Sequence, residues 1–225
     1  MRDDDPMLDM LVEASRALAA DPAVVLHGGG NTSVKSTWTD LTGREVPVLH
    51  VKGSGHDLAS IGRDGFAPLR LDRLRELLPP VVVPDLRLAD ELRCALLDPH
   101  APDPSVETLV HALLPHTAVL HSHADALLAL MDSVDGEQRI RDLYGDRLVV
   151  VDYAMPGPDL VAACARAWAD QAHQGTEGLV VLQHGLFTVG ADPREALDRH
   201  RSVLADARAA LPAVATPAPA PVPVP

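Results

Sequence analysis

The amino-acid sequence predicts a single α/β domain, and two observations lead to this prediction. Apolar residues at helical spacing alternate along the chain with short apolar runs, so helices and strands are mixed throughout. A chain of 225 residues with 47% hydrophobic residues can form one sizeable core and does not require a second. We therefore expect one domain over 1–211. Over 212–225, Pro alternates with Ala or Val, which predicts a polyproline-like or disordered tail.

The first half of the chain predicts one helix, two strands that end in glycine turns, and three further helices. Helical spacing of apolar residues predicts a helix over 8–19, with Asp5 and Pro6 as its start signals. Strands are expected at 24–26 and 48–51, each just before a glycine-rich turn. The three further helical patterns cover 71–78, 86–97 and 105–114, the last with Ser105 as its N-cap.

The second half of the chain predicts four strands and two helices. An apolar strand is expected over 118–123 and another over 148–151. A helical pattern over 159–172 is followed by strands at 178–183 and 185–189. The closing helix is expected over 194–211, and the sequence contains no internal repeat.

Composition limits the partners that this chain can have. A formal net charge of −13 disfavours binding to nucleic acid or to an anionic membrane, because both require Lys and Arg. We therefore expect a small-molecule or protein partner. Cys94 and Cys164 do not form a CxxC pair and are expected to be reduced and buried. The first six residues lack the basic and apolar regions of a signal peptide, and no apolar run is long enough for a membrane span, so a cytoplasmic protein is expected.

Three histidines follow apolar strands and form a candidate metal site. Residues two apart on a strand share a face, so His121 and His123 present two imidazoles side by side. A catalytic zinc site needs three protein ligands and one open position, and His184, at the end of another strand, is the best third ligand. The alternative is that the His-x-His pair arose by chance and that each ring has only a hydrogen-bonding role.

Other histidines compete for the ligand role. Seven of them are expected to be structural, in loops, in turns or on polar helix faces: His27, His50, His56, His100, His116, His173 and His200. His111 is less clear, because it is helical and near Glu107.

Glu107 and the glycine turns are candidates for acid/base chemistry and anion binding. Glu107 is expected in the first turn of its helix, on the same face as His111, where a favourable interaction with the helix dipole is the plainer explanation. The turns at 28–30 and 53–55 offer bare backbone N–H groups that can cradle a phosphate, together with Asn31, Ser54 and Ser105. Tight turns that need positive φ are the alternative, and neither turn is a nucleotide-binding motif.

Five short motifs occur in a fixed order along the chain. They are Gly30-Asn31-Thr32-Ser33, Lys52-Gly53-Ser54-Gly55, Pro104-Ser105-Val106-Glu107, His121-Ser122-His123-Ala124-Asp125 and Gln183-His184-Gly185-Leu186. This order resembles that of the class II aldolase/adducin family, over about residues 8–205. The stretches 43–46, 65–69 and 105–129 look most like the aldolase domain of bifunctional rhamnulose-phosphate aldolase/alcohol dehydrogenase proteins.

The resemblance implies a three-layer α/β/α sandwich with a central, mainly antiparallel sheet, commonly assembled as a homotetramer with active sites between subunits. It implies that His121, His123 and His184 hold Zn²⁺, or another divalent metal, and that Glu107 moves a proton on the dihydroxyacetone-phosphate portion of the substrate. It also implies phosphate binding by a set of loop residues. These are Gly30, Asn31, Ser54, Gly55 and Ser105.

The implied activity is cleavage of a ketose 1-phosphate, of the rhamnulose, fuculose or ribulose type, to dihydroxyacetone phosphate and a small aldehyde. Related epimerases usually carry Asp where Glu107 stands, so the Glu favours carbon–carbon cleavage. Two departures matter: Val106 stands where many fuculose-phosphate aldolases have a second Ser, and no tyrosine of the C-terminal region can exchange a proton with the aldehyde. Alternatives are a decarboxylase, dehydratase or epimerase at the same metal site, or a non-catalytic module like the adducin head.

Overall fold

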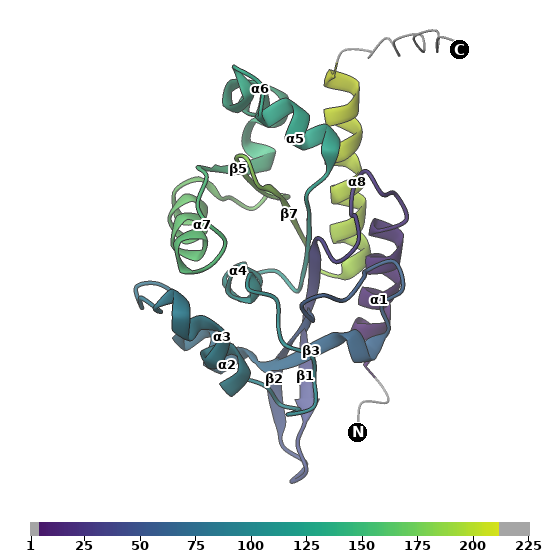
Figure 1. Ribbon diagram of the computed structural model, residues 1–225, viewed down its shortest axis with the longest axis vertical. Helices are drawn as coiled ribbons and strands as arrows, with labels where there is room; N and C mark the ends of the chain where they lie inside the picture. Colours follow the sequence, from purple (N-terminus) through teal and green to yellow (C-terminus); the bar gives the residue numbers. More distant parts are fainter. Residues whose placement is uncertain (1–4, 212–225) are drawn as a thin grey trace, which may run out of the picture.

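The computed structural model describes residues 5–211, and this part of the chain folds around one seven-stranded sheet (Figure 1). The strand order is β3-β2-β1-β4-β7-β6-β5, and every neighbouring pair is antiparallel except β5 and β6. The strands are β1 (Asn31–Thr39), β2 (Glu45–Lys52), β3 (Phe66–Arg70), β4 (Ala118–Ser122), β5 (Leu148–Val151), β6 (Gly178–Val181) and β7 (Gly185–Gly190). The prediction of a mainly antiparallel sheet is confirmed.

Helices cover both faces of this sheet, as the three-layer prediction requires. The α-helices of the described residues are α1 (Pro6–Leu18), α2 (Leu71–Glu76), α3 (Asp85–Cys94), α4 (Thr108–Leu113), α5 (Asp125–Met131), α6 (Gly136–Tyr144), α7 (Pro158–Gln171) and α8 (Pro193–Ala210). One core packs α1, α5, α6 and α8 against the sheet, and a second core packs α2, α3, α4 and α7 against the opposite face. Each face of the sheet is therefore buried by its own layer of helices.

The central strand β4 alternates between the two cores. Ala118 and Leu120 belong to the core with α1 and α8, and Val119 belongs to the core with α4 and α7. Because successive strand residues point to opposite faces, His121 lies on the α4 side of the sheet and Ser122 on the α8 side. This alternation separates two groups of buried polar residues at the end of β4.

The predicted helix ends agree with the structure where capping residues mark them. Asp5 caps α1 by accepting hydrogen bonds from the backbone N–H groups of Met7 and Leu8, and Pro6 follows in the first turn. Asp192 caps α8 in the same way, with Pro193 directly after it. None of the helices in the range 5–211 is long and apolar enough to cross a membrane.

Two predicted elements need correction, and several elements of the structure are not among those predicted. The strand expected at 24–26 is turn and irregular backbone, and the neighbouring strand is β1, which starts at Asn31. β1 is rich in Ser and Thr, and it is stabilised by pairing with both β2 and β4, which an apolar pattern does not reveal. β3 is also absent from the predicted elements, because Pro68 disfavours a strand, although this strand lies at the sheet edge where proline is tolerated.

Cys164 is buried as expected, but Cys94 at the end of α3 is exposed. The remaining corrections concern helices. α4 begins at Thr108, three residues later than expected, and its N-cap residue is Glu107 instead of Ser105. The sequence patterns do not predict α5 and α6, although these helices close the face of the sheet over β5 and β7. The tail prediction for 212–225 falls outside the described residues, and the single-domain prediction stays a prediction.

Candidate metal centre

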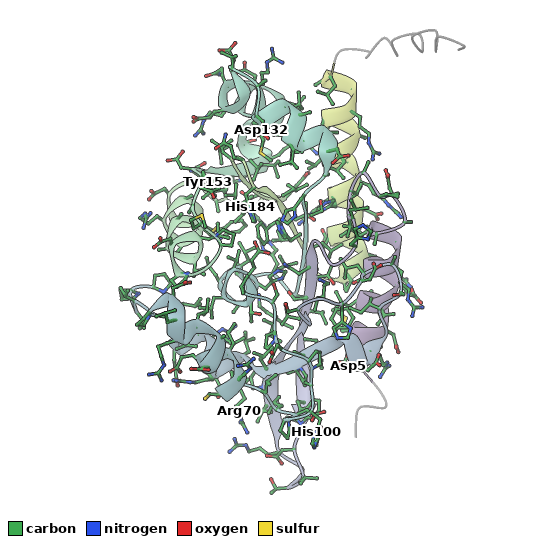
Figure 2. The ribbon with its side chains drawn as sticks, viewed as in Figure 1. Asp5, Arg70, His100, Asp132, Tyr153 and His184 are labelled. Atoms are coloured by element: carbon green, nitrogen blue, oxygen red, sulfur yellow. The ribbon has the colours of Figure 1, made fainter. Side chains whose placement is uncertain are left out.

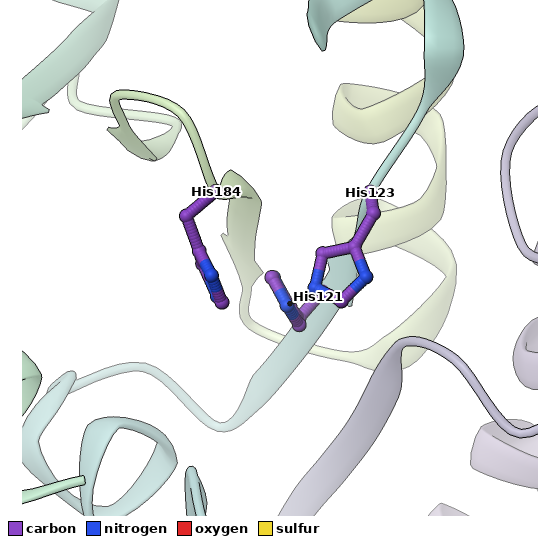
Figure 3. Close-up of side chains that lie close together, drawn as sticks. All are labelled: His121, His123 and His184. Atoms are coloured by element: carbon purple, nitrogen blue, oxygen red, sulfur yellow. Dashed lines mark hydrogen bonds between the residues drawn. The ribbon is translucent and has the colours of Figure 1, made fainter. Parts of the chain in front are cut away.

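Three imidazole rings converge where β4 ends and the β6–β7 hairpin turns (Figure 3). One ring nitrogen from each of His121, His123 and His184 lies within 4.8 Å of the others. The Nε2 atoms of His121 and His123 are 2.8 Å apart. His121 is the penultimate residue of β4 and His123 follows its last residue, so the predicted side-by-side arrangement is present.

A tight hairpin places the third ring. Gln183 has φ of 55°, in the left-handed region that costs a non-glycine residue about 1 kcal/mol or more. His184 follows it and donates its backbone N–H to the Val181 carbonyl, which closes the turn between β6 and β7. At Gly185 an added Cβ would lie 2.5 Å from the Ser122 carbonyl oxygen, so only glycine lets the hairpin approach β4 this closely.

The His121 ring is oriented for coordination by its other nitrogen. Its Nδ1 lies 3.0 Å from the Leu186 carbonyl oxygen, which can only accept, so Nδ1 carries the hydrogen and Nε2 has a free lone pair. Phe187 stacks on the ring with centroids 3.9 Å apart and planes 17° apart. Burial lowers the pKa of His121 well below its ordinary value, which keeps the ring neutral.

The cluster is open to solvent on one side. His121 is buried, His184 is partly exposed, and His123 is exposed (Figure 2 shows His184 among the surrounding side chains). Partial burial also lowers the pKa of His123, and the neighbouring His184 contributes to this shift. Three imidazoles with converging nitrogens and one accessible side form the donor set that a catalytic zinc ion uses. The residues present therefore fit a divalent metal.

Glu107 lies directly against the three rings. Its Oε1 atom is 2.7 Å from His184 Nε2, and its Oε2 atom is 3.4 Å from His121 Nε2. The side chain is 5% exposed although it sits at the start of α4. Burial alone would raise the pKa of Glu107, but interactions with His121, His184 and Asn31 outweigh it, and the pKa lies well below its usual range. The carboxylate is therefore ionised at neutral pH.

Glu107 and a metal compete for His184. A carboxylate oxygen at 2.7 Å requires the hydrogen of the ring on Nε2. A ligand nitrogen must instead present its lone pair to the cation, so metal binding through Nε2 would open this hydrogen bond. Metal loading would then free one carboxylate oxygen of Glu107 or make that oxygen a ligand.

Two of the predicted anion-binding residues, Asn31 and Ser105, contact Glu107, and a third, Gly30, lies against the backbone of His121. Asn31 pairs with His121 across β1 and β4, and its Nδ2 atom donates to Glu107 Oε2 at 2.5 Å and to Ser105 Oγ at 3.1 Å. The Ser105 hydroxyl also accepts the backbone N–H of Glu107 at 3.3 Å. Gly30 has φ of 61°, and an added Cβ would lie 2.7 Å from the His121 carbonyl oxygen. Asn31 therefore holds the carboxylate, Ser105 holds the backbone of Glu107, and Gly30 lets β1 start close to His121.

The other two predicted anion-binding residues, Ser54 and Gly55, are exposed in the turn after β2. This turn lies against the first glycine turn, because an added Cβ on Gly28 would be 3.6 Å from Gly55. Ser54 donates its backbone N–H to Asp103 at 2.7 Å, which joins the turn to the segment before Ser105. The structure thus brings the two glycine turns and the segment before Ser105 together.

Lys52, which is not among the residues predicted for the site, supplies positive charge between these loops. Its side chain is buried, and Nζ donates to the Gly28 carbonyl at 2.7 Å. Burial lowers the pKa of Lys52, while Asp57 and Glu107 act in the opposite direction. Its place in the Lys52-Gly53-Ser54-Gly55 motif is a signal that could have identified it. Phe187, which stacks on His121, is also not among the predicted site residues, and nothing in the sequence singles it out.

Two further histidines are buried. His200 has the structural role expected of it, but its setting differs: it is fully buried on α8, where Ser122 and Thr188 contact its ring nitrogens. His111 is fully buried on α4 and contacts Asn31 and Ser33. Its spacing of four residues from Glu107 is the signal that points to this part of the site.

Comparison with known proteins gives consistent matches. The family model for the class II aldolase and adducin N-terminal domain matches residues 9–211. An "uncharacterized oxidoreductase YuxG" from Bacillus subtilis (strain 168) is 38% identical over 200 residues. That alignment covers 89% of this chain and 29% of the relative, so the chain spans less than a third of the relative's length.

Solved structures agree with the family match. The N-terminal class II aldolase domain of a conserved protein from Thermoplasma acidophilum has a TM-score of 0.83 at 38% identity, covering 92% of this chain and 93% of that chain. The L-fuculose-1-phosphate aldolase from Thermus thermophilus has a TM-score of 0.56 at 16% identity, covering 90% and 94%. At such low identity the second match shows a shared fold alone.

Proposed function

Because this chain belongs to the class II aldolase and adducin family, we propose that it is a metal-dependent aldolase acting on a ketose 1-phosphate. The products would be dihydroxyacetone phosphate and a small aldehyde. The observation that carries this proposal is the contact between a buried, ionised Glu107 and the three converging imidazoles. A proton-transfer group beside a metal-ligand set is what this cleavage requires.

We propose that His121, His123 and His184 hold the metal, which is Zn²⁺ or another divalent ion. When bound there, the metal supplies a Lewis acid that polarises the carbonyl and hydroxyl oxygens of a ketose. The chain itself fixes the ligand geometry through the Leu186 carbonyl and the stacked Phe187 ring. The exposed side at His123 leaves room for a substrate to approach.

Glu107 is proposed as the acid/base. Cleavage breaks the C3–C4 bond, leaves its electron pair on C3 of the three-carbon fragment, and ends when C3 takes up a proton. The C4 hydroxyl loses its proton as the aldehyde carbonyl forms. In the condensing direction, an ionised Glu107 removes the proton from C3 of dihydroxyacetone phosphate, which agrees with its lowered pKa. No tyrosine or other group is assigned to the aldehyde oxygen.

The loops that converge on Glu107 are proposed to bind the phosphate. Ser54 and Gly55 offer exposed backbone N–H groups, and Lys52 brings the cation that an anion site needs in a chain of net charge −13. Gly30, Asn31 and Ser105 complete the set, although the Asn31 amide already donates to Glu107 and Ser105. A phosphate would have to share or displace these bonds.

The test is release of dihydroxyacetone phosphate from a panel of ketose 1-phosphates, followed in a coupled assay with metal-loaded protein. Release from one member of the panel, lost after removal of the metal by a chelator and regained on its return, supports the proposal. Metal binding without release from any member contradicts it and favours a decarboxylase, dehydratase or epimerase at the same site. Protein that binds no metal favours a non-catalytic module instead.

Three further expectations stay predictions. These are assembly as a homotetramer, a cytoplasmic location, and the special likeness to the aldolase domain of bifunctional rhamnulose-phosphate aldolase/alcohol dehydrogenase proteins. The first can be checked by the molar mass of the protein in solution.

A further inference from the structure

A chain of hydrogen bonds runs from β1 through α4 to the carboxylate of Glu107. His111 Nδ1 is 2.7 Å from the Ser33 hydroxyl, and His111 Nε2 forms a short hydrogen bond with Asn31 Oδ1. The Asn31 amide then donates to Glu107 Oε2 at 2.5 Å. All four side chains lie in the buried layer between the sheet and α4.

The direction of every hydrogen bond in this chain follows from the Asn31 amide. Its Nδ2 atom donates both to Glu107 Oε2 and to Ser105 Oγ, so its carbonyl oxygen faces His111. That carbonyl oxygen only accepts, so His111 Nε2 carries the ring hydrogen. His111 Nδ1 is then the acceptor for the Ser33 hydroxyl. The neutral Nε2–H tautomer is the one neutral form of His111 that satisfies every partner.

The His111 ring is held in place by its surroundings. It is fully buried, and it meets Phe187 edge-on with centroids 5.8 Å apart and planes 69° apart. Phe187 in turn stacks on His121. Burial also lowers the pKa of His111 to about 3, so the ring stays neutral over the physiological range. The contact with the Asn31 carbonyl oxygen then sets the tautomer of this neutral ring.

We propose that His111 is a positioning residue for the acid/base: its Nε2–H fixes the orientation of the Asn31 amide, and this amide aims Glu107. The proposal deepens the proposed aldolase function and rests on it. Without the Nε2–H donor, the Asn31 side chain can turn over and present its carbonyl oxygen to Glu107. Two acceptors would then face each other in a buried site, and the carboxylate would move away from its working position.

The test compares two substitutions of similar bulk that differ in one donor. His111→Gln retains an N–H group able to reach the position of Nε2, whereas His111→Leu removes it and keeps the site filled. For metal-loaded His111→Leu, kcat for dihydroxyacetone phosphate release is expected to fall by about 10–100-fold with KM nearly unchanged. His111→Gln should recover most of this loss, and metal stoichiometry should match the wild type in both variants.

A second measurement does not depend on activity. In protein with ¹⁵N-labelled histidine, the His111 ring, assigned by the loss of its signal in His111→Gln, should show the hydrogen on Nε2 in wild type. A hydrogen on Nδ1 would overturn the proposal, as would equal kcat for His111→Leu and wild type, or equal losses in the two variants. If wild type releases no dihydroxyacetone phosphate, the aldolase proposal fails. The measured tautomer of His111 then still tests the proposed orientation of the Asn31 amide.

Discussion

The two faces of the sheet at the end of β4 carry histidines in opposite situations. On the α4 side, His121 uses Nδ1 for the Leu186 carbonyl and turns Nε2 toward His123 Nε2 and Glu107. On the α8 side, both ring nitrogens of His200 have partners. Thr188 donates its hydroxyl to the Ala196 carbonyl, so His200 Nδ1–H donates to Thr188, and Nε2 accepts from the Ser122 hydroxyl.

The difference teaches what separates a candidate ligand from a structural histidine. Both His121 and His200 are fully buried and carry their hydrogen on Nδ1. Burial lowers the pKa of both, to about 3 for His200, so charge does not distinguish them. What distinguishes them is the second nitrogen: His121 Nε2 lies beside an imidazole and a carboxylate, both of which can bind a cation, whereas His200 Nε2 faces the hydroxyl of Ser122. The predictions below test this contrast.

The largest effect is expected from His123→Ala. Two imidazoles hold zinc far less well than three, so metal affinity should fall by about 100-fold or more and turnover should be abolished. Elemental analysis after dialysis and the aldolase assay measure both. Because His123 is exposed, the free energies of unfolding of the metal-free variant and of metal-free wild type should differ by no more than about 1 kcal/mol. Unchanged metal content would remove His123 from the ligand set.

Glu107→Gln should separate binding from chemistry on the α4 side. The amide can neither remove the C3 proton in condensation nor return it in cleavage, so kcat should drop by about 10²–10⁴-fold while the metal remains bound. The check is the rate of dihydroxyacetone phosphate release by metal-loaded protein, with the metal content determined on the same sample. Near-normal turnover would mean that another group is the base.

His200→Leu should have the reverse pattern on the α8 side. It leaves the Ser122 hydroxyl without its acceptor and Thr188 without a donor inside the core, so the free energy of unfolding should fall by about 2–4 kcal/mol. Metal stoichiometry should stay at the wild-type value. Urea unfolding of the metal-free proteins gives the first quantity, and loss of metal in a folded variant would argue against two separate roles.

The smallest effect is a pH dependence carried by His200. Its pKa is about 3 in the folded protein and about 6.5 when unfolded, so its neutral state stabilises the fold fully above pH 6.5. As pH falls below 6.5, the unfolded chain binds a proton that the folded chain does not, and stability is lost. The stability advantage of metal-free wild type over His200→Leu should therefore shrink by about 2 kcal/mol between pH 7 and pH 5. A constant difference would contradict the buried neutral ring.

Patterns of residues close in sequence predict much of this molecule. The order of most helices and strands follows from apolar spacing, and the Asp5 and Asp192 caps start their helices within three residues of the predicted positions. His121 and His123 share a face because of strand geometry alone, and His184 could be inferred from its similar place at a strand end. The mainly antiparallel sheet is implied by family resemblance, not by any periodicity.

Features that depend on distant contacts could not be predicted. β1 is polar along most of its length, and its strand state is fixed by its neighbours on both sides. The burial of His200 depends on Ser122 and Thr188, which are 78 and 12 residues away in the chain. The role of Asn31 as a link between His111 and Glu107 likewise requires β1 to lie against α4, and its local sequence suggests only an anion loop.

The most direct test of the metal centre is zinc K-edge absorption spectroscopy on protein loaded with one equivalent of zinc. The account predicts three imidazole nitrogens at about 2.0–2.1 Å and one further light ligand, with the imidazole signal reduced in His184→Ala. A first shell of sulfur, or of oxygens without imidazole, would contradict the assignment of His121, His123 and His184 as the ligands.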